Sequence, residues 1–167
     1  MLRFIIAVFA GLMALQAFPM RAAEPTLPNI PGITTRDMFP GGCVDCHRNR
    51  PEIKRDFRIS TYIRDWTQAV DPKVRNRVQA IAPKGVKLSG KHPPMAAESF
   101  RDVPKSCNPC HANPQAKIPQ MGPMLHALHL MGGTANHFLT LYKGECALCH
   151  KFDSKTASWR IPSLPER

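Results

Sequence analysis

The sequence predicts a mainly α-helical protein with much irregular structure, built from short helices with little or no sheet. Apolar residues recur at helical spacing only over short stretches, and 17 prolines and 10 glycines interrupt the 167-residue chain. No apolar run reaches the roughly 18 residues of a membrane span, which excludes a protein with several such spans. Aromatic residues make up only 7% of the chain. We therefore expect something other than side chains to fill part of the interior.

The first 23 residues have the pattern of a secretory signal peptide. Arg3 supplies a positive start, residues 4–15 form an apolar run, and small residues allow cleavage after Ala23 or, as an alternative, after Ala17. We expect cleavage and export to the periplasm, with an uncleaved membrane anchor as the alternative. The chain carries a formal net charge of +11, which favours acidic partners or an anionic membrane surface.

The first half of the exported chain contains an extended lead and two short helices. Residues 24–42 hold four prolines and show no helical periodicity. Residues 62–66 form a short amphipathic piece, and Asp71 and Pro72 are a good N-cap and first residue for a second helix. Pro83 ends that helix. The simplest interpretation is that both helices pack their apolar residues into the core and leave their basic residues in solvent.

The second half contains a connection, two helices and an irregular tail. Residues 83–106 are rich in proline, glycine and lysine and predict a loop-like connection. A helix is expected after Pro123, ending at Gly132, and a shorter one from Asn136, an N-cap, through Leu141. The tail, 159–167, is expected to be irregular.

The six cysteines form three identical Cys-x-x-Cys-His motifs, the attachment motif of c-type haem. Two thiols on one helical turn can bond both vinyl groups of a single porphyrin, and the adjacent histidine can bind its iron as proximal ligand. We therefore expect three covalently attached haem c groups. Zinc or disulfides are the alternative, although a zinc site needs four converging ligands and three half-sites leave one unmatched. The motif residues are Cys43, Cys46, His47, Cys107, Cys110, His111, Cys146, Cys149 and His150.

Four further histidines are candidates for the distal position on the three irons. They are His92, His129, His126 and His137, in the order in which we favour them. His126 and His129 lie three residues apart on the helix expected after Pro123, so both can face haems packed against it. One of the four is then a bystander. Methionine is the rival distal ligand, with Met95 and Met121 the candidates.

The motifs divide the chain into four parts. Residues 1–23 are the signal, 24–42 the extended lead, 43–106 a first haem unit with its connection, and 107–167 a two-haem unit with the irregular tail. The second and third motifs are assigned to one unit because they are closer in sequence than the first two. Short helices are thus expected to pack around three covalently bound haems.

With these three motifs and the histidines between them, the chain resembles the small periplasmic multihaem c-type cytochromes. This group includes the class III cytochromes, such as trihaem cytochrome c7, and the cytochrome subunits of periplasmic reductases. The chain is longer per haem than cytochrome c7 and has a larger gap between its first two motifs. The resemblance implies low-spin haems, mostly with two histidine ligands, that transfer electrons between redox partners without being an enzyme.

Two functions and several partners follow as expectations. The alternative to electron transfer is an enzyme in which one five-coordinate iron reduces a small oxyanion or a peroxide, but four spare histidines for three irons argue against an open position. Expected partners are redox proteins with acidic docking surfaces, a larger oxidoreductase complex, or a membrane surface bound peripherally. Nucleic acid is not expected, because the chain has an export signal and no nucleic-acid-reading motif.

Overall fold

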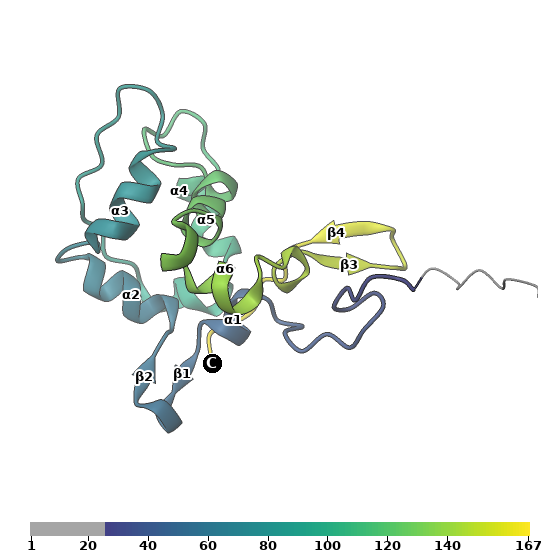
Figure 1. Ribbon diagram of the computed structural model, residues 1–167. Helices are drawn as coiled ribbons and strands as arrows, with labels where there is room; N and C mark the ends of the chain where they lie inside the picture. Colours follow the sequence, from purple (N-terminus) through teal and green to yellow (C-terminus); the bar gives the residue numbers. More distant parts are fainter. Residues whose placement is uncertain (1–25) are drawn as a thin grey trace, which may run out of the picture.

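The computed structural model describes residues 26–167 as short helices and two small hairpins joined by long irregular segments (Figure 1). The signal peptide expected at 1–23 lies outside the described residues. Within the described part, no helix is long and apolar enough to cross a membrane.

The helices are short, and the strands form two separate antiparallel pairs. The α-helices are α1 (Cys43–Cys46), α2 (Ile59–Trp66), α3 (Pro72–Gln79), α4 (Asn108–His111), α5 (Met121–Leu130) and α6 (His137–Tyr142). The 3-10 turns are Pro51–Ile53, Ala97–Arg101, Lys105–Cys107, Gly133–Ala135 and Cys146–Leu148. The strands are β1 (Asn49–Arg50), β2 (Arg55–Asp56), β3 (Lys151–Asp153) and β4 (Ser158–Arg160), paired as β1–β2 and β3–β4. The expected short helices and irregular segments are present, but the fold is mixed, because the chain also builds two small sheets.

The β3–β4 hairpin corrects the expectation of an irregular tail. Phe152 and Trp159 face each other across the two strands, with ring centroids 5.3 Å apart. Cross-strand aromatic pairs of this kind stabilise a hairpin. A strand of three residues is too short to show the alternation of apolar and polar residues that predicts a strand. The hairpin could therefore not be predicted from the residue pattern.

Two helix starts confirm their predicted caps. Asp71 accepts hydrogen bonds from the amides of Lys73 and Val74 at the start of α3, and Asn136 accepts one from Phe138 at the start of α6. Both satisfy amides that a helix leaves without partners.

Helix α5 begins at Met121, three residues before the start expected after Pro123. Pro123 therefore occupies the first turn, where its missing N–H costs nothing because no acceptor precedes it. The helix is held by its neighbours α3 and α6. Arg77 on α3 donates to the carbonyl of Leu128 at 3.1 Å. The buried Asn136 donates from Nδ2 to the carbonyls of Leu128, His129 and Met131, at 2.7–3.1 Å.

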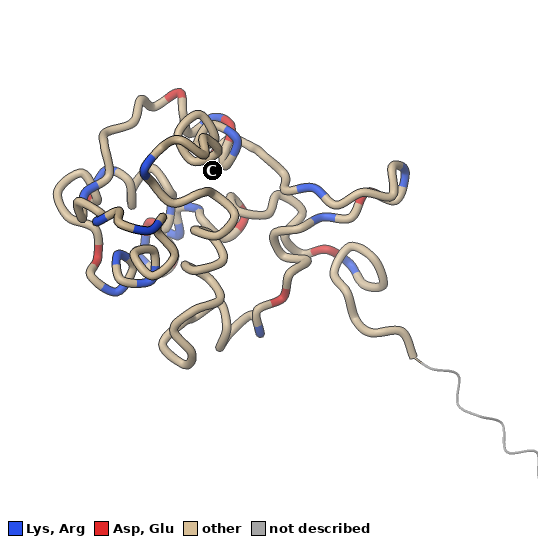
Figure 2. The backbone as a smooth tube through the Cα atoms, turned by 90° about the horizontal axis from the view of Figure 1, so that it is seen from above, with Lys and Arg blue, Asp and Glu red and all other residues tan. Residues whose placement is uncertain are grey.

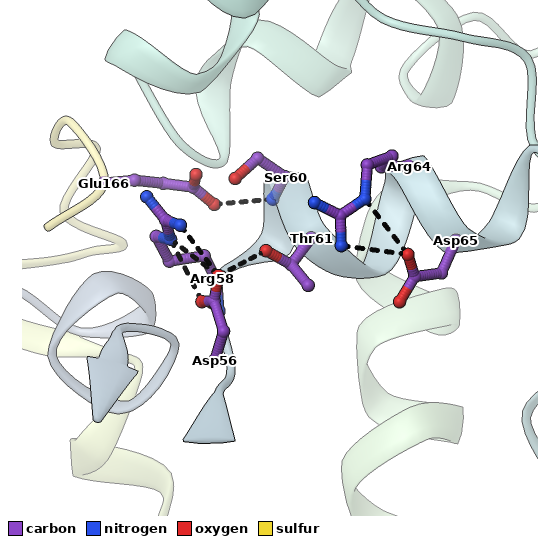
Figure 3. Close-up of polar contacts among 7 residues, drawn as sticks. All are labelled: Asp56, Arg58, Ser60, Thr61, Arg64, Asp65 and Glu166. Carbon is purple, nitrogen blue, oxygen red and sulfur yellow. Dashed lines mark hydrogen bonds and ion pairs between the residues drawn. The ribbon is translucent and has the colours of Figure 1, made fainter. Parts of the chain in front are cut away.

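The C-terminal tail returns to the first half of the chain and caps α2. Figure 3 shows the two carboxylates at this helix start. The amide of Ser60 donates to Glu166 at 2.8 Å, while Thr61 and the guanidinium of Arg58 both donate to Asp56 Oδ2 at 2.7 Å. These contacts join residues that lie on opposite sides of the expected boundary at 106. The division into 43–106 and 107–167 stays a prediction.

Buried apolar side chains are few and small in the described part of the chain. They are Val44, Ile63, Val78, Val103, Ala127, Ala147 and Leu148. Cores of domains this size normally rest on larger side chains in close packing. Three of these residues, Val44, Ala147 and Leu148, lie between the cysteines of the first and third motifs.

Candidate haem-binding sites

Six histidine rings face one another in three pairs, and each pair joins a motif histidine to a histidine from elsewhere. The ring centroids are 6.1 Å apart for His47 and His129, 6.3 Å for His111 and His92, and 6.1 Å for His150 and His126. Every motif histidine therefore has one partner, and no partner is shared. His137, the fourth candidate, is exposed at the start of α6 and belongs to none of these pairs.

The spacing of each pair suits one metal ion between two imidazoles. A metal–nitrogen bond of about 2 Å on each side, with each ring centre about 1 Å behind its nitrogen, places two ring centroids about 6 Å apart. Ordinary aromatic contacts cover about 4.5–7 Å, so the distance alone does not decide. The selective partnering of all three motif histidines carries more weight.

Backbone carbonyls hold four of the six rings by Nδ1. The bonds run from His47 to Phe57 at 3.1 Å, from His111 to Pro119 at 2.8 Å, from His92 to Pro93 at 2.7 Å and from His129 to Leu125 at 2.9 Å. A carbonyl can only accept, so Nδ1 carries the proton in each case and Nε2 keeps its lone pair. That tautomer and fixed orientation are what a metal-binding imidazole requires.

Aromatic side chains gather around the first motif. The ring of Tyr62 meets His47 edge-on at 6.0 Å, and Phe138 meets His129 in the same way at 5.4 Å. Burial lowers the pKa of His47, and the Phe57 carbonyl opposes this while the neighbouring His129 adds to it. The neutral imidazole that can bind a metal is thereby favoured.

The six cysteines are all free thiols in the structure, and two motifs form the expected tight turn. The amide of His47 bonds to the carbonyl of Cys43 at 2.8 Å, and that of His150 bonds to Cys146 at 2.9 Å. The second motif runs from a 3-10 turn ending at Cys107 into α4. Each pair of cysteines thus lies about one turn apart, with its histidine following at once.

The first and third motifs lie side by side although they are farthest apart in sequence. Burial and, after it, the nearby thiols of Cys149, Cys46 and Cys107 together raise the pKa of Cys43 to about 11. Gly42, at a φ of +62°, is close enough to the third motif that a Cβ there would lie 3.8 Å from the carbonyl of Cys149. The positive φ favours glycine at this position.

A buried ion pair that sequence reasoning missed lies beside these two motifs. Lys151 Nζ is 3.0 Å from Asp37 and donates to the carbonyl of Ala147 at 2.7 Å. Its positive charge lowers the pKa of Cys46 and of Cys149, although burial raises both overall. The only signal in the sequence was the position of Lys151, directly after His150.

The three histidine pairs favour histidine over the two methionines considered as rival distal ligands. Each motif histidine of the described chain faces a histidine ring, whereas Met95 lies against α2 in a hollow with Ile63 and Thr67. Met121 is the first residue of α5. Residues 26–167 contain no group of three or more metal-ligating side chains. A haem iron needs only two, because the porphyrin supplies the other four ligands.

No protein-family model, curated protein or solved structure matches this chain. The functional argument therefore rests on the arrangement of the residues themselves.

Proposed function

We propose that the protein is a periplasmic trihaem c-type cytochrome that transfers electrons between redox partners. Each haem is held by two thioether bonds and by two histidines. The first centre is Cys43, Cys46, His47 and His129; the second is Cys107, Cys110, His111 and His92; the third is Cys146, Cys149, His150 and His126. The observation that carries the proposal is the one-to-one partnering of motif and non-motif histidines. His137 is the bystander.

The chemistry of the haem, once bound, is the reversible uptake of one electron by its iron. The chain's own residues attach the ring, hold an imidazole on each side of it and keep substrates away from the metal. The carbonyls that fix the imidazoles strengthen them as donors and so help set the reduction potential. With both axial positions taken, the geometry changes little between oxidation states, which suits an electron carrier.

Helix α5 serves two centres at once. His126 and His129 are neighbours on one face of this helix, about 5–6 Å apart at Cβ, yet they face His150 and His47 respectively. The first and third centres are therefore neighbours. The thiol of Cys107 also lies close enough to Cys43 to raise its pKa. The proposed spatial order is second, first, third, with the first centre in the middle.

Covalent haem is tested by mass and colour. Protein exported from a host with intact cytochrome maturation should carry three haems, adding about 1.85 kDa through its three attachment motifs. Colourless protein with free or cross-linked thiols would contradict the proposal at its foundation.

The axial ligands are tested by near-infrared magnetic circular dichroism of His→Met variants. His92→Met, His126→Met and His129→Met should each convert one third of the bis-histidine signal into a histidine–methionine signal. His137→Met is the matched control and should leave the spectrum unchanged.

Carbon monoxide should not bind the reduced parent protein. Stoichiometric binding at one haem would favour the alternative, an enzyme with an open iron.

A further inference from the structure

The second centre is the most exposed of the three at its point of attachment. Two residues separate the cysteines of every motif, and their burial differs. Val44 in the first motif is fully buried, and Ala147 and Leu148 in the third are 2% and 8% exposed. In the second motif, Asn108 and Pro109 are both exposed. A porphyrin edge bonded there reaches the surface.

Exposure alone does not select the second centre, because the third also opens to solvent at Cys146 and His126. Charge separates the two. The third motif follows Glu145 directly, and its own lysine, Lys151, is buried against Asp37. The exposed Lys143 and Lys155 also lie near the third motif, but the carboxylates Glu145 and Asp153 lie in the same stretch, which therefore carries no surplus of positive charge.

Three exposed lysines flank the second centre, and we call them the lysine collar: Lys91, Lys105 and Lys117. Lys91 directly precedes His92, and Lys105 lies two residues before Cys107. Lys117 lies in the loop that leads to Pro119, whose carbonyl holds His111. Among the described residues, Lys91 and Lys117 have no carboxylate within 4.0 Å, and Lys105 has only the exposed Asp102 at 3.6 Å.

The loop after α3, which carries Lys91, belongs to a basic end of the molecule. Figure 2 shows lysines and arginines over the end that carries α2, α3 and the loop that follows, and others on the β3–β4 hairpin at the opposite side. That loop is joined to α2 where the amide of His92 bonds to the carbonyl of Trp66 at 2.9 Å. The ligand of the second centre is thus part of the same basic surface.

We infer that the second centre is the port at which an acidic electron-transfer protein docks on the lysine collar. This inference rests on the proposed function. Solvated lysines without carboxylate partners attract an acidic surface over long range and raise the rate of encounter more than the lifetime of the complex. Fast encounter and fast release are what a carrier needs. An exposed porphyrin edge inside the collar gives the shortest route for the electron.

The experiment measures the reduction of the oxidised holoprotein by photoreduced flavodoxin, an acidic one-electron donor, in a stopped-flow instrument. The collar variant is Lys91→Glu, Lys105→Glu and Lys117→Glu together. The control is Lys54→Glu, Lys155→Glu and Arg160→Glu, which makes the same change in net charge at exposed positions on the two hairpins. At low salt the collar variant should lose about tenfold or more in second-order rate, and the control about two- to threefold at most. High salt should remove the difference.

Each result decides the question. Equal losses in both variants, or no loss in either, would overturn the port, since net charge rather than the collar would then set the rate. Binding to vesicles of 3:1 phosphatidylcholine and phosphatidylglycerol that is lost in the collar variant, with unchanged reduction by flavodoxin, would assign the surface to a membrane and also overturn the port. Haem content and the visible spectrum are measured first on every variant. Three haems with no collar effect would defeat the port alone, whereas protein without haem would defeat the proposed function.

Discussion

At the scale of single residues, the side chain of Asn136 joins the end of α5 to the start of α6. Its side chain donates to three carbonyls at the end of α5 and accepts from the first turn of α6, and it is 5% exposed. Asn136→Ala should destabilise the holoprotein by about 1–3 kcal/mol, because buried polar groups lose their partners. Asn136→Asp should cost at least as much, since a carboxylate would face carbonyls. Urea unfolding measures both, with Asn29→Ala at an exposed position as control. A stability equal to that of the parent would contradict this role.

The buried pair of Lys151 and Asp37 should tune the potentials of the first and third centres. A positive charge that favours the thiolates of Cys46 and Cys149 also favours the reduced iron, because reduction removes one positive charge. Lys151→Met should therefore lower the reduction potentials of these two centres, and Asp37→Asn should raise them. Spectroelectrochemical titration gives the sign, and the exposed Lys155→Met provides the control. Shifts of the same sign in both variants would show that repacking, not charge, dominates.

Residue patterns predicted the helix caps well and the long-range partners of single side chains poorly. The caps at Asp71 and Asn136 could be predicted because they act on amides two or three residues away. The pairing of His92 with His111 could not, because it depends on where the loop before His92 is tied to α2. The same holds for Lys151, whose partner Asp37 lies 114 residues earlier.

At the scale of elements, α2 depends on a cap that comes from the far end of the chain. Glu166→Ala should lose the bond to the Ser60 amide and destabilise the protein by about 1 kcal/mol, the usual worth of a helix cap. Glu166→Gln keeps an acceptor oxygen and should lose less. Denaturant midpoints of the two variants, measured side by side, check the order. The prediction fails if the glutamine variant is the weaker of the two.

The second carboxylate at this helix start makes stability depend on pH. Hydrogen bonds from Arg58, and next from Thr61, hold the pKa of Asp56 well below its usual range. The folded pKa is below the unfolded one, so the stabilisation is present above about pH 4 and is lost as the pH falls further. Asp56→Asn should reduce the loss of stability that the protein suffers between neutral and acid pH. Urea midpoints at pH 7 and pH 3 test it, and an unchanged difference between the two pH values would assign the acid loss to other groups.

Elements were predictable where a cap or a proline marks them and unpredictable where they depend on a neighbour. Helix α3 was foreseen from Asp71 and Pro72. The β3–β4 hairpin was not, because its strands are three residues long and it is held by one pair of rings, Phe152 and Trp159. In α5 the sequence predicted that two histidines share a face. Packing against α3 and α6 determines which motif each of them meets.

At the scale of the whole molecule, the spatial order that we propose for the three centres differs from the order of their motifs in the chain. The C-terminal tail folds back to α2, and α5 carries the two histidines that pair with those of the first and the third motif. In the proposed route of electrons through the three haems, the centre in the middle is the one whose motif comes first in the sequence. The ends are the two centres with exposed attachment residues, Cys110 and Cys146.

This order predicts how a single ligand change redirects electrons. Exchanging a histidine ligand for methionine raises the reduction potential of its haem. In His129→Met the haem of the first centre has a higher reduction potential than its neighbours. Electrons from photoreduced flavodoxin should therefore collect there and reach the third centre more slowly. In His126→Met the raised potential belongs to the third centre, at the end of the route, and this centre should be reduced at least as fast as in the parent protein. Rapid freezing followed by electron paramagnetic resonance resolves the oxidation of each centre with time. A third centre that fills equally fast in His129→Met would show that electrons bypass the first centre, and the proposed order would then be wrong.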